Sequence, residues 1–129
     1  MTSPPRGQAA IRGRVTIASL QRQYRQFVAE REWEQFQSPK NLVMALAGEA
    51  GELTEIFQWL TEEQSSAVMA DESRAAQVRD ELADVFAYLI RLADVLGVDL
   101  EQAFAEKMIK NAHRYPIETA RGSAAKAVP

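Results

Sequence analysis

Apolar residues recur every three or four positions along most of the chain, the spacing that places them on one face of an α-helix. Four such runs predict long helices at residues 16–33, 38–60, 73–96 and 99–115. Residues 61–72 are mostly small and polar without a sustained period, so we expect them to form a connecting loop. No stretch alternates as a strand would. The predicted fold class is therefore all-α, with the helices packed as a four-helix bundle.

Capping residues mark the ends of these predicted helices. Thr16 and Ser38 each precede an apolar run, where a hydroxyl oxygen can accept a hydrogen bond from the free amides of the first turn. Asp99 and Gln102 have the spacing of a reciprocal capping box. Gly97 follows the third run and suits the left-handed conformation that ends many helices.

Composition adds limits on the class of protein. The chain has 129 residues, which is typical of one domain, and its net charge of −3 disfavours nucleic acid as a partner. Cysteine is absent, so disulfides, thiolate metal sites and a cysteine nucleophile are excluded, and a reducing cytoplasmic location is the simplest expectation. No apolar run is long enough for a membrane span, so no membrane association is expected.

Two pairs of acidic residues lie at unusual positions. Glu49 falls inside the apolar stripe of the second predicted helix, and Glu52 lies at the edge of that stripe. Glu81 and Asp84 repeat the three-residue spacing on the third predicted helix. If these helices pack antiparallel across residues 61–72, all four carboxylates converge. Surface acids at helical spacing are common, but acids within an apolar stripe are not.

Four converging carboxylates require a cation, because desolvation and mutual repulsion both penalise their charged forms. An all-oxygen carboxylate set suits Mg²⁺ or Mn²⁺. The only histidine, His113, lies far from both acid pairs in sequence, which disfavours a di-iron site of the Glu-x-x-His type, and we expect it at the surface.

Further polar and aromatic residues are candidates for holding a ligand. Lys107 and Asn111 are four apart and flank the helical position of Phe104, where a lysine would need an anion such as phosphate, although it could instead cover the rim of the core. Trp59 lies seven residues after Glu52, and a base could stack there or on Trp33. Each tryptophan could equally belong to the core or to a subunit interface.

Several motifs together resemble a known family. They are WEQF at 33–36, SPKNLVMALAGEAGELTEIFQW at 38–59, ELADVFAY at 81–88 and KMIKNAHRYP at 107–116. In this order they resemble the MazG-type all-α nucleoside triphosphate pyrophosphohydrolases, and most of all the dCTP pyrophosphatase branch. The resemblance extends over roughly residues 20–126, including RGSAAK at 121–126.

The resemblance implies Mg²⁺-dependent hydrolysis of a nucleoside triphosphate, preferably dCTP or a related or modified pyrimidine deoxynucleotide, to the monophosphate and pyrophosphate, as in clearing the nucleotide pool. It also implies a homo-oligomer, either a dimer or a tetramer, with the site partly shared between subunits. The metal ligands implied are Glu49, Glu52, Glu81 and Asp84. Of these, Glu49 and Glu52 are expected closest to the attacking water. Residues implied to bind substrate are Trp33, Trp59, Tyr88, Lys107 and Asn111.

Two positions depart from the animal pattern of that branch. Tyr24 and Gln37 stand where the animal enzymes have histidines, and we expect both to contact the base and to influence which base is preferred. The resulting organisation is a flexible arm at residues 1–15, a helical catalytic domain at 16–116 and a tail at 117–129.

Two alternatives to this hypothesis stay open. One is a pyrophosphohydrolase of the same superfamily with another substrate, dUTP or phosphoribosyl-ATP. The other is a non-enzymatic helical module whose apolar stripes serve only as an interaction surface.

Overall fold

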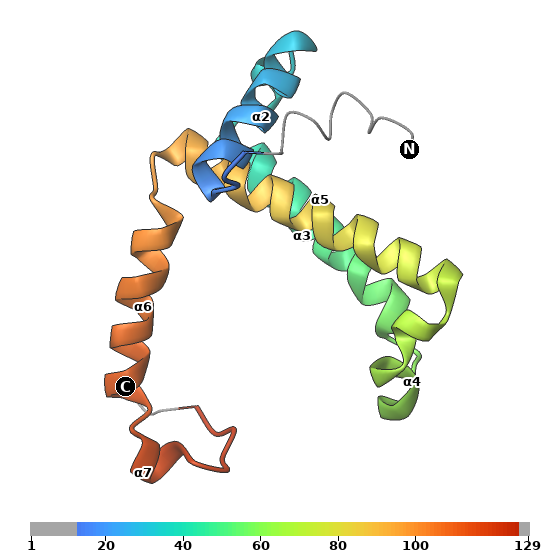
Figure 1. The fold of residues 1–129 in the computed structure, drawn as a ribbon, viewed down its shortest axis with the longest axis vertical. Coiled ribbons are helices and arrows are strands. Elements are labelled where there is room, and N and C mark those ends of the chain that lie inside the picture. Colours follow the sequence, from blue (N-terminus) through green and yellow to red (C-terminus); the bar gives the residue numbers. More distant parts are fainter. Residues whose placement is uncertain (1–12, 127–129) are drawn as a thin grey trace. The chain divides into compact units, whose positions relative to one another are not determined.

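The computed structural model describes residues 13–126, and every regular element among them is helical, which confirms the all-α prediction. The predicted arm at 1–15 lies mostly outside the described residues. Figure 1 shows the long helices in their order along the chain. They are α2 (Ile17–Glu30), α3 (Pro39–Phe57), α5 (Glu72–Leu96) and α6 (Leu100–Arg114).

The described chain divides into two compact units, which meet in sequence between Gly97 and Val98. In the first unit, α3 and α5 lie side by side and antiparallel (Figure 1), and α2 packs against α5. Their buried apolar side chains form a narrow core. Its members on these helices are Val28, Leu42, Ala75, Val78, Ile90 and Ala93. The second unit contains α6 and the short helix α7 (Ile117–Ala120), which lies within the predicted tail.

The predicted caps are mostly confirmed. Thr16 Oγ1 accepts a hydrogen bond from the Ser19 amide at 3.0 Å, and Ser38 caps α3 ahead of a proline. Gly97 adopts a left-handed conformation with φ of 69°. Asp99 caps α6, but the prediction of a reciprocal hydrogen bond from the Gln102 side chain was wrong. That side chain donates to Glu106 one turn further along the helix.

Residues 61–72 are not a simple loop as predicted. They contain α4 (Glu62–Ser66) and a single 3₁₀ turn, η2 (Val68–Ala70). Thr61 and Gln64 form a capping box that starts α4, a signal that requires no apolar period. Helices this short leave no sustained stripe, so the sequence periodicity missed them.

Two helices end earlier than predicted, and both tryptophans lie outside them. Arg31 caps α2, Glu32 has a left-handed φ of 54°, and Trp33 precedes the 3₁₀ turn η1 (Glu34–Phe36). Helix α3 ends at Phe57, so Trp59 does not continue the strip of Glu52 as the sequence suggested. Beyond its last residue a helix no longer determines where side chains point. The directions predicted for both tryptophans from helical periodicity were therefore wrong.

The predicted apolar stripe of α5 is only partly buried. Val78 and Ala93 are buried, whereas Leu82, Phe86 and Leu89 are exposed. Phe104 on α6 is exposed as well. Periodicity identifies the apolar face of a helix, but what covers that face depends on tertiary packing.

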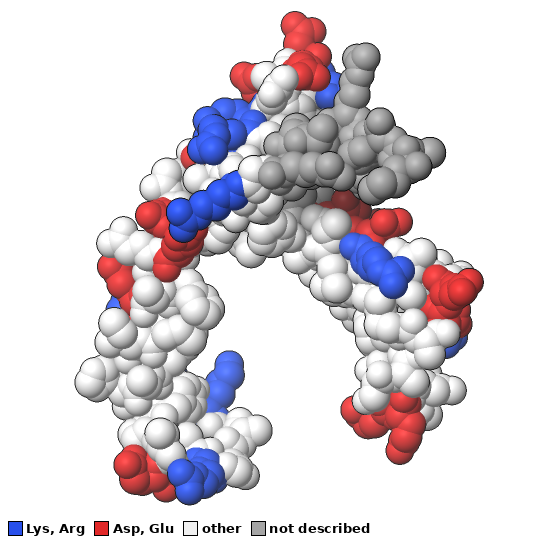
Figure 2. Space-filling model, viewed as in Figure 1, with Lys and Arg blue, Asp and Glu red and all other residues white. Residues whose placement is uncertain are grey.

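Charges of both signs are interspersed on the visible face of the molecule, as Figure 2 shows, with no continuous basic field. Within residues 13–126, no helix has both the length and the apolar content needed to cross a bilayer.

Candidate functional site

The packing of α3 against α5 brings three glutamates together. Glu49 and Glu52 lie one turn apart on α3, and Glu81 comes from α5. Each offers a carboxylate oxygen, and these three atoms all lie within 4.8 Å of one another. We call these residues the acid cluster. The predicted convergence of the two helices' acids is thus present for three of the four residues.

The acid cluster contains buried oxygens that need a partner. Glu49 Oε2 and Glu81 Oε2 are both buried, and no donor group in the described part of the chain bonds to either atom. The hydrogen bond with Glu49 is the largest cause that raises the pKa of Glu81 to about 7, and burial and the neighbouring Glu52 act in the same direction. For Glu49 the hydrogen bond with Glu81 lowers the pKa, but burial and the charges of Glu52 and Asp84 outweigh it and raise the pKa overall.

The acid cluster opens onto a surface hollow of about 390 Å³. Glu52 and Glu81 line it together with Glu55, Ile56 and Gln77. A ligand of modest size can therefore reach the carboxylates without any rearrangement of α3 and α5.

These residues fit a hard divalent cation. Three carboxylate oxygens within 4.8 Å of one another, from residues two of which have a buried oxygen with no donor in the described chain, supply the all-oxygen environment that Mg²⁺ or Mn²⁺ prefers. A cation would neutralise the repulsion that otherwise holds a proton on Glu81. The donor set alone does not distinguish the two metals.

Asp84, the fourth predicted ligand, lies one turn after Glu81 on α5 and is exposed. Its charge reaches Glu49, whose pKa it raises, but its oxygens are not among the three that gather within 4.8 Å. Its role as a ligand stays a prediction.

A second cavity, of about 200 Å³, lies one turn along α3 from the acid cluster. We call it the aromatic pocket, because Trp33, Phe36 and Tyr88 all line it. Its lining residues are Trp33, Phe36, Gln37, Asn41, Leu42, Ala45 and Tyr88. Three of the predicted substrate-binding residues, Trp33, Gln37 and Tyr88, therefore meet in one place.

Tyr88 links the aromatic pocket to the acid cluster. It follows Asp84 by one turn on α5, and burial raises the pKa of its hydroxyl, with the charges of Glu49 and Asp84 adding to the effect. The hydroxyl thus stays protonated and can donate a hydrogen bond near neutral pH.

Tyr24 lies in a separate apolar cavity of about 310 Å³ beside the aromatic pocket. Its ring stacks on Phe27 at 5.9 Å between centroids, and Phe27 meets the edge of Trp33 at 5.7 Å. Arg31 lies 3.7 Å above the Phe27 ring. Tyr24 is thus connected to the aromatic pocket through Phe27 and Trp33.

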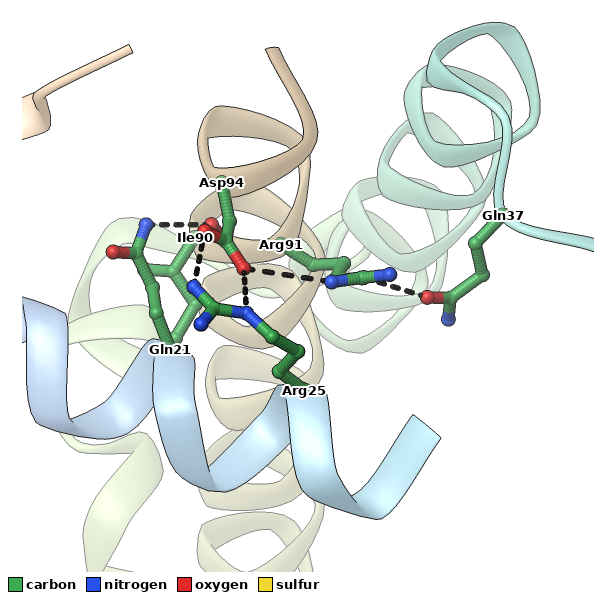
Figure 3. Close-up of polar contacts among 6 residues, drawn as sticks. All are labelled: Gln21, Arg25, Gln37, Ile90, Arg91 and Asp94. Atoms are coloured by element: carbon green, nitrogen blue, oxygen red, sulfur yellow. Dashed lines mark hydrogen bonds and ion pairs between the residues drawn. The ribbon is translucent and has the colours of Figure 1, made fainter. Parts of the chain in front are cut away.

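Gln37 is held by a polar network that the sequence analysis missed (Figure 3). Arg91 Nε donates to Gln37 Oε1 at 2.9 Å, and Arg91 also contacts Asp94 at 3.4 Å. Arg25 on α2 donates two hydrogen bonds to Asp94, at 2.7 and 3.0 Å, and Gln21 of α2 donates to the Ile90 carbonyl.

Of the remaining predicted residues, one follows α3 and the others lie on α6 of the second unit. Trp59 is 86% exposed just beyond α3. Lys107 is exposed and Asn111 half-buried on α6 in the second unit, and His113 is exposed there, as predicted for a surface residue.

Sequence signals existed for some of the residues that were missed. Arg91 follows Asp84 by seven positions and Tyr88 by three, so it falls on the same strip of α5. Asn41 follows the Ser38 cap in the first turn of α3, where its side chain can reach back toward the preceding segment. Gln77 gave no signal, because a lone glutamine one turn before Glu81 is ordinary on a helix.

The chain matches the model of the MazG-like family over residues 44–127. It belongs to that family. It is 44% identical over 111 residues to a mouse protein named dCTP pyrophosphatase 1 and 43% identical to the human protein of that name. Both alignments include 86% of this chain, which spans 65% of the length of those relatives.

A solved structure is also similar to this MazG-like chain. It is the crystal structure of a pyrophosphatase from Archaeoglobus fulgidus DSM 4304, with 35% sequence identity and a TM-score of 0.73. The similarity covers 81% of this chain and 95% of the archaeal one. The helical fold described above is therefore also found in that solved structure.

The metal-free protein should lose stability as pH rises. The folded state keeps a proton on Glu81 up to a pKa of about 7, whereas the unfolded chain releases it near 4.5. The folded state thus binds more protons in this window, so the free energy of unfolding falls from about pH 4.5 to about pH 7. Melting in chelator across this range measures the effect. Glu81→Gln should weaken the decline and melt higher than wild type near pH 8.

Glu55→Gln is the matched control, since it removes a carboxylate from the same hollow but not from the acid cluster. Its free energy of unfolding should fall with rising pH as steeply as that of the wild type. A Glu81→Gln protein with an unchanged decline would show that the buried proton lies elsewhere.

Proposed function

We propose that this MazG-like chain is a cytoplasmic, Mg²⁺-dependent nucleoside triphosphate pyrophosphohydrolase. Its substrate would be dCTP or a related or modified pyrimidine deoxynucleotide, cleaved to the monophosphate and pyrophosphate, which would clear that nucleotide from the pool. The observation that carries the proposal is the acid cluster one helical turn from a base-sized aromatic pocket. The names of the mouse, human and archaeal relatives support the same class of reaction.

The spacing of the two features suits a nucleotide. Ala45 in the aromatic pocket precedes Glu49 by four residues on α3, a rise of roughly 6 Å. A base and its phosphates are separated by a sugar, so a base in the pocket directs its phosphates along α3 toward the carboxylates. Tyr88 lies between them and offers a hydroxyl donor to the sugar or phosphates.

The acid cluster would hold the metal, which when bound neutralises charge on the phosphates and lowers the pKa of a water. Glu49, Glu52 and Glu81 would be its ligands, with Asp84 joining from the next turn of α5. We assign Glu49 and Glu52 to orienting the attacking water, because they are the ligands from α3, the helix that continues from the aromatic pocket. Lys107 and Asn111 would contact phosphate oxygens, which lysine pairs as a point charge.

A homo-oligomer, a dimer or a tetramer, is part of the proposal. Leu82, Phe86 and Leu89 leave an apolar face of α5 exposed in the described chain, as Val43 and Met44 do on α3. Exposed apolar surface of this kind commonly marks a subunit interface in helical proteins.

Glu49→Gln should lower kcat by a factor of at least about 100 with little change in the helical fold. The substitution keeps the side chain's shape but removes a ligand charge from the acid cluster, and such a metal ligand is needed for the reaction itself. Turnover of dCTP with Mg²⁺, with pyrophosphate and orthophosphate quantified separately, measures the effect. Circular dichroism checks the fold.

Glu55→Gln, at the rim of the same hollow, should retain at least half of the wild-type turnover. Near wild-type turnover in Glu49→Gln would contradict the assignment of the acid cluster. Absence of pyrophosphate release by the wild type from every triphosphate in a panel would instead favour the non-enzymatic interaction module.

Trp33→Ala should raise KM for all accepted triphosphates by roughly tenfold to a hundredfold, because stacking of a base on an aromatic ring contributes about 1–3 kcal/mol. Trp33 lines the aromatic pocket, whereas Trp59 lines none of the cavities described above and is almost fully exposed. Trp59→Ala therefore serves as the comparison. An unchanged KM in Trp33→Ala, together with a raised KM in Trp59→Ala, would move the base to Trp59.

A further inference from the structure

The side-chain amide of Gln37 lies between two different environments. One is the aromatic pocket, whose wall it forms in part. The other is the guanidinium group of Arg91, whose Nε donates to Gln37 Oε1 at 2.9 Å (Figure 3). No hydrogen bond among residues 13–126 engages Gln37 Nε2, so this half of the amide is available to a ligand in the pocket.

Arg91 fixes which half of the amide stays available. A guanidinium carries only donors, so Gln37 must turn its carbonyl oxygen toward Arg91, and the NH₂ group is left on the other branch. A glutamine without such a partner can exchange the two by rotating its terminal torsion. Here rotation would place an NH₂ group against another donor.

Arg91 is itself held in place. It is only 8% exposed, and it contacts Asp94, which in turn accepts two hydrogen bonds from Arg25. Arg25 extends from α2, so the chain of contacts from Gln37 passes across α5 and reaches α2. The bonds from Arg25, at 2.7 and 3.0 Å, are charge-assisted and stronger than neutral ones, so they hold Asp94 in place beside the guanidinium of Arg91.

Asn41, on the same pocket, is oriented in the opposite sense. Its Nδ2 donates to the Phe36 carbonyl at 3.0 Å, and no hydrogen bond within the described part of the chain engages its Oδ1. The aromatic pocket therefore carries one fixed donor, from Gln37, and one fixed acceptor, from Asn41.

We propose that Arg91 is a positioning residue that holds Gln37 as a hydrogen-bond donor in the aromatic pocket, and that the Gln37 and Asn41 pair thereby selects cytosine over uracil and thymine. Cytosine presents an acceptor at N3 beside the donor amino group at C4. Uracil and thymine present the reverse, a donor at N3 beside an acceptor at C4. The inference rests on the proposed function, because it assigns the base specificity of that site.

The preference should respond to Gln37 and Arg91 in different ways. Arg91→Met removes the constraint, so the amide can present either atom, and the ratio of kcat/KM for dCTP to that for dUTP should fall about tenfold. Gln37→Glu keeps the contact with Arg91 but replaces the donor by an acceptor, which favours the N3 donor of uracil while Asn41 still favours the C4 amino group of cytosine, so the preference for dCTP should be largely lost. Arg91→Lys, which restores a donor-only group, should recover part of the dCTP preference.

Arg79→Met is the matched control, because Arg79 is an exposed arginine on the same helix and lines neither cavity of the site. It should leave the ratio within about twofold of wild type. A structural loss alone lowers both kcat/KM values together and leaves their ratio unchanged. The ratio is therefore the readout that separates positioning from stability, and Gln37→Glu provides the test if Arg91→Met does not fold.

A binding measurement separates this inference from the proposed function. Calorimetry with dCMP and with dUMP requires no turnover, and the wild type should bind dCMP at least tenfold more tightly, a preference that Gln37→Glu should largely remove. Equal affinity for both, or binding of neither, would overturn the inference even if triphosphates are hydrolysed. Loss of hydrolysis with the dCMP preference intact would overturn only the proposed function. A dCTP to dUTP ratio that stays at the wild-type value in Gln37→Glu would also overturn the inference.

Discussion

The close approach of Glu49 and Glu81 between α3 and α5 is the constraint on which the site depends. Two carboxylates with buried oxygens and a third within 4.8 Å cannot all be charged without compensation. In the metal-free protein the compensation is a proton on Glu81, whose pKa the hydrogen bond with Glu49 and burial raise to about 7. The repulsion between these carboxylates destabilises the metal-free fold. It also favours the binding of a divalent cation, which would relieve it. The contact between α3 and α5 that destabilises the metal-free fold is therefore also the one that could bind a cation.

Near the C-terminal end of α5, a buried charged group finds its partners within the chain. Arg91 is as buried as many core residues, but it has Gln37 and Asp94 as partners, and Asp94 has Arg25. The result is a polar network that needs no external ligand and that fixes the orientation of a pocket wall. The aromatic pocket lies between this closed network and the open acid cluster. A pocket wall of fixed orientation beside carboxylates that lack a partner would suit the charged, base-containing substrate proposed above.

Much of this could be predicted from the sequence, because period and capping are local properties. The four long helices, the caps at Thr16 and Ser38, and the unusual position of Glu49 in an apolar stripe all follow from residue spacing. The ends of the helices were harder to predict from the sequence. Because α2 and α3 each end about one turn before the predicted residue, the predicted positions of Trp33 and Trp59 were wrong. The exposure of Leu82 and Phe86, and the network around Arg91, depend on which elements pack together, which no single periodic pattern determines.

The central claim is that the acid cluster holds a proton in the place of a cation, and the protons released on Mg²⁺ binding test it most directly. Calorimetric titration of the metal-free protein in two buffers with different ionisation enthalpies gives that number. The account predicts about one proton released per bound Mg²⁺ near pH 6, where Glu81 is protonated, and almost none near pH 8.5. Absence of Mg²⁺ binding, or binding near pH 6 with no dependence on the buffer, would contradict it.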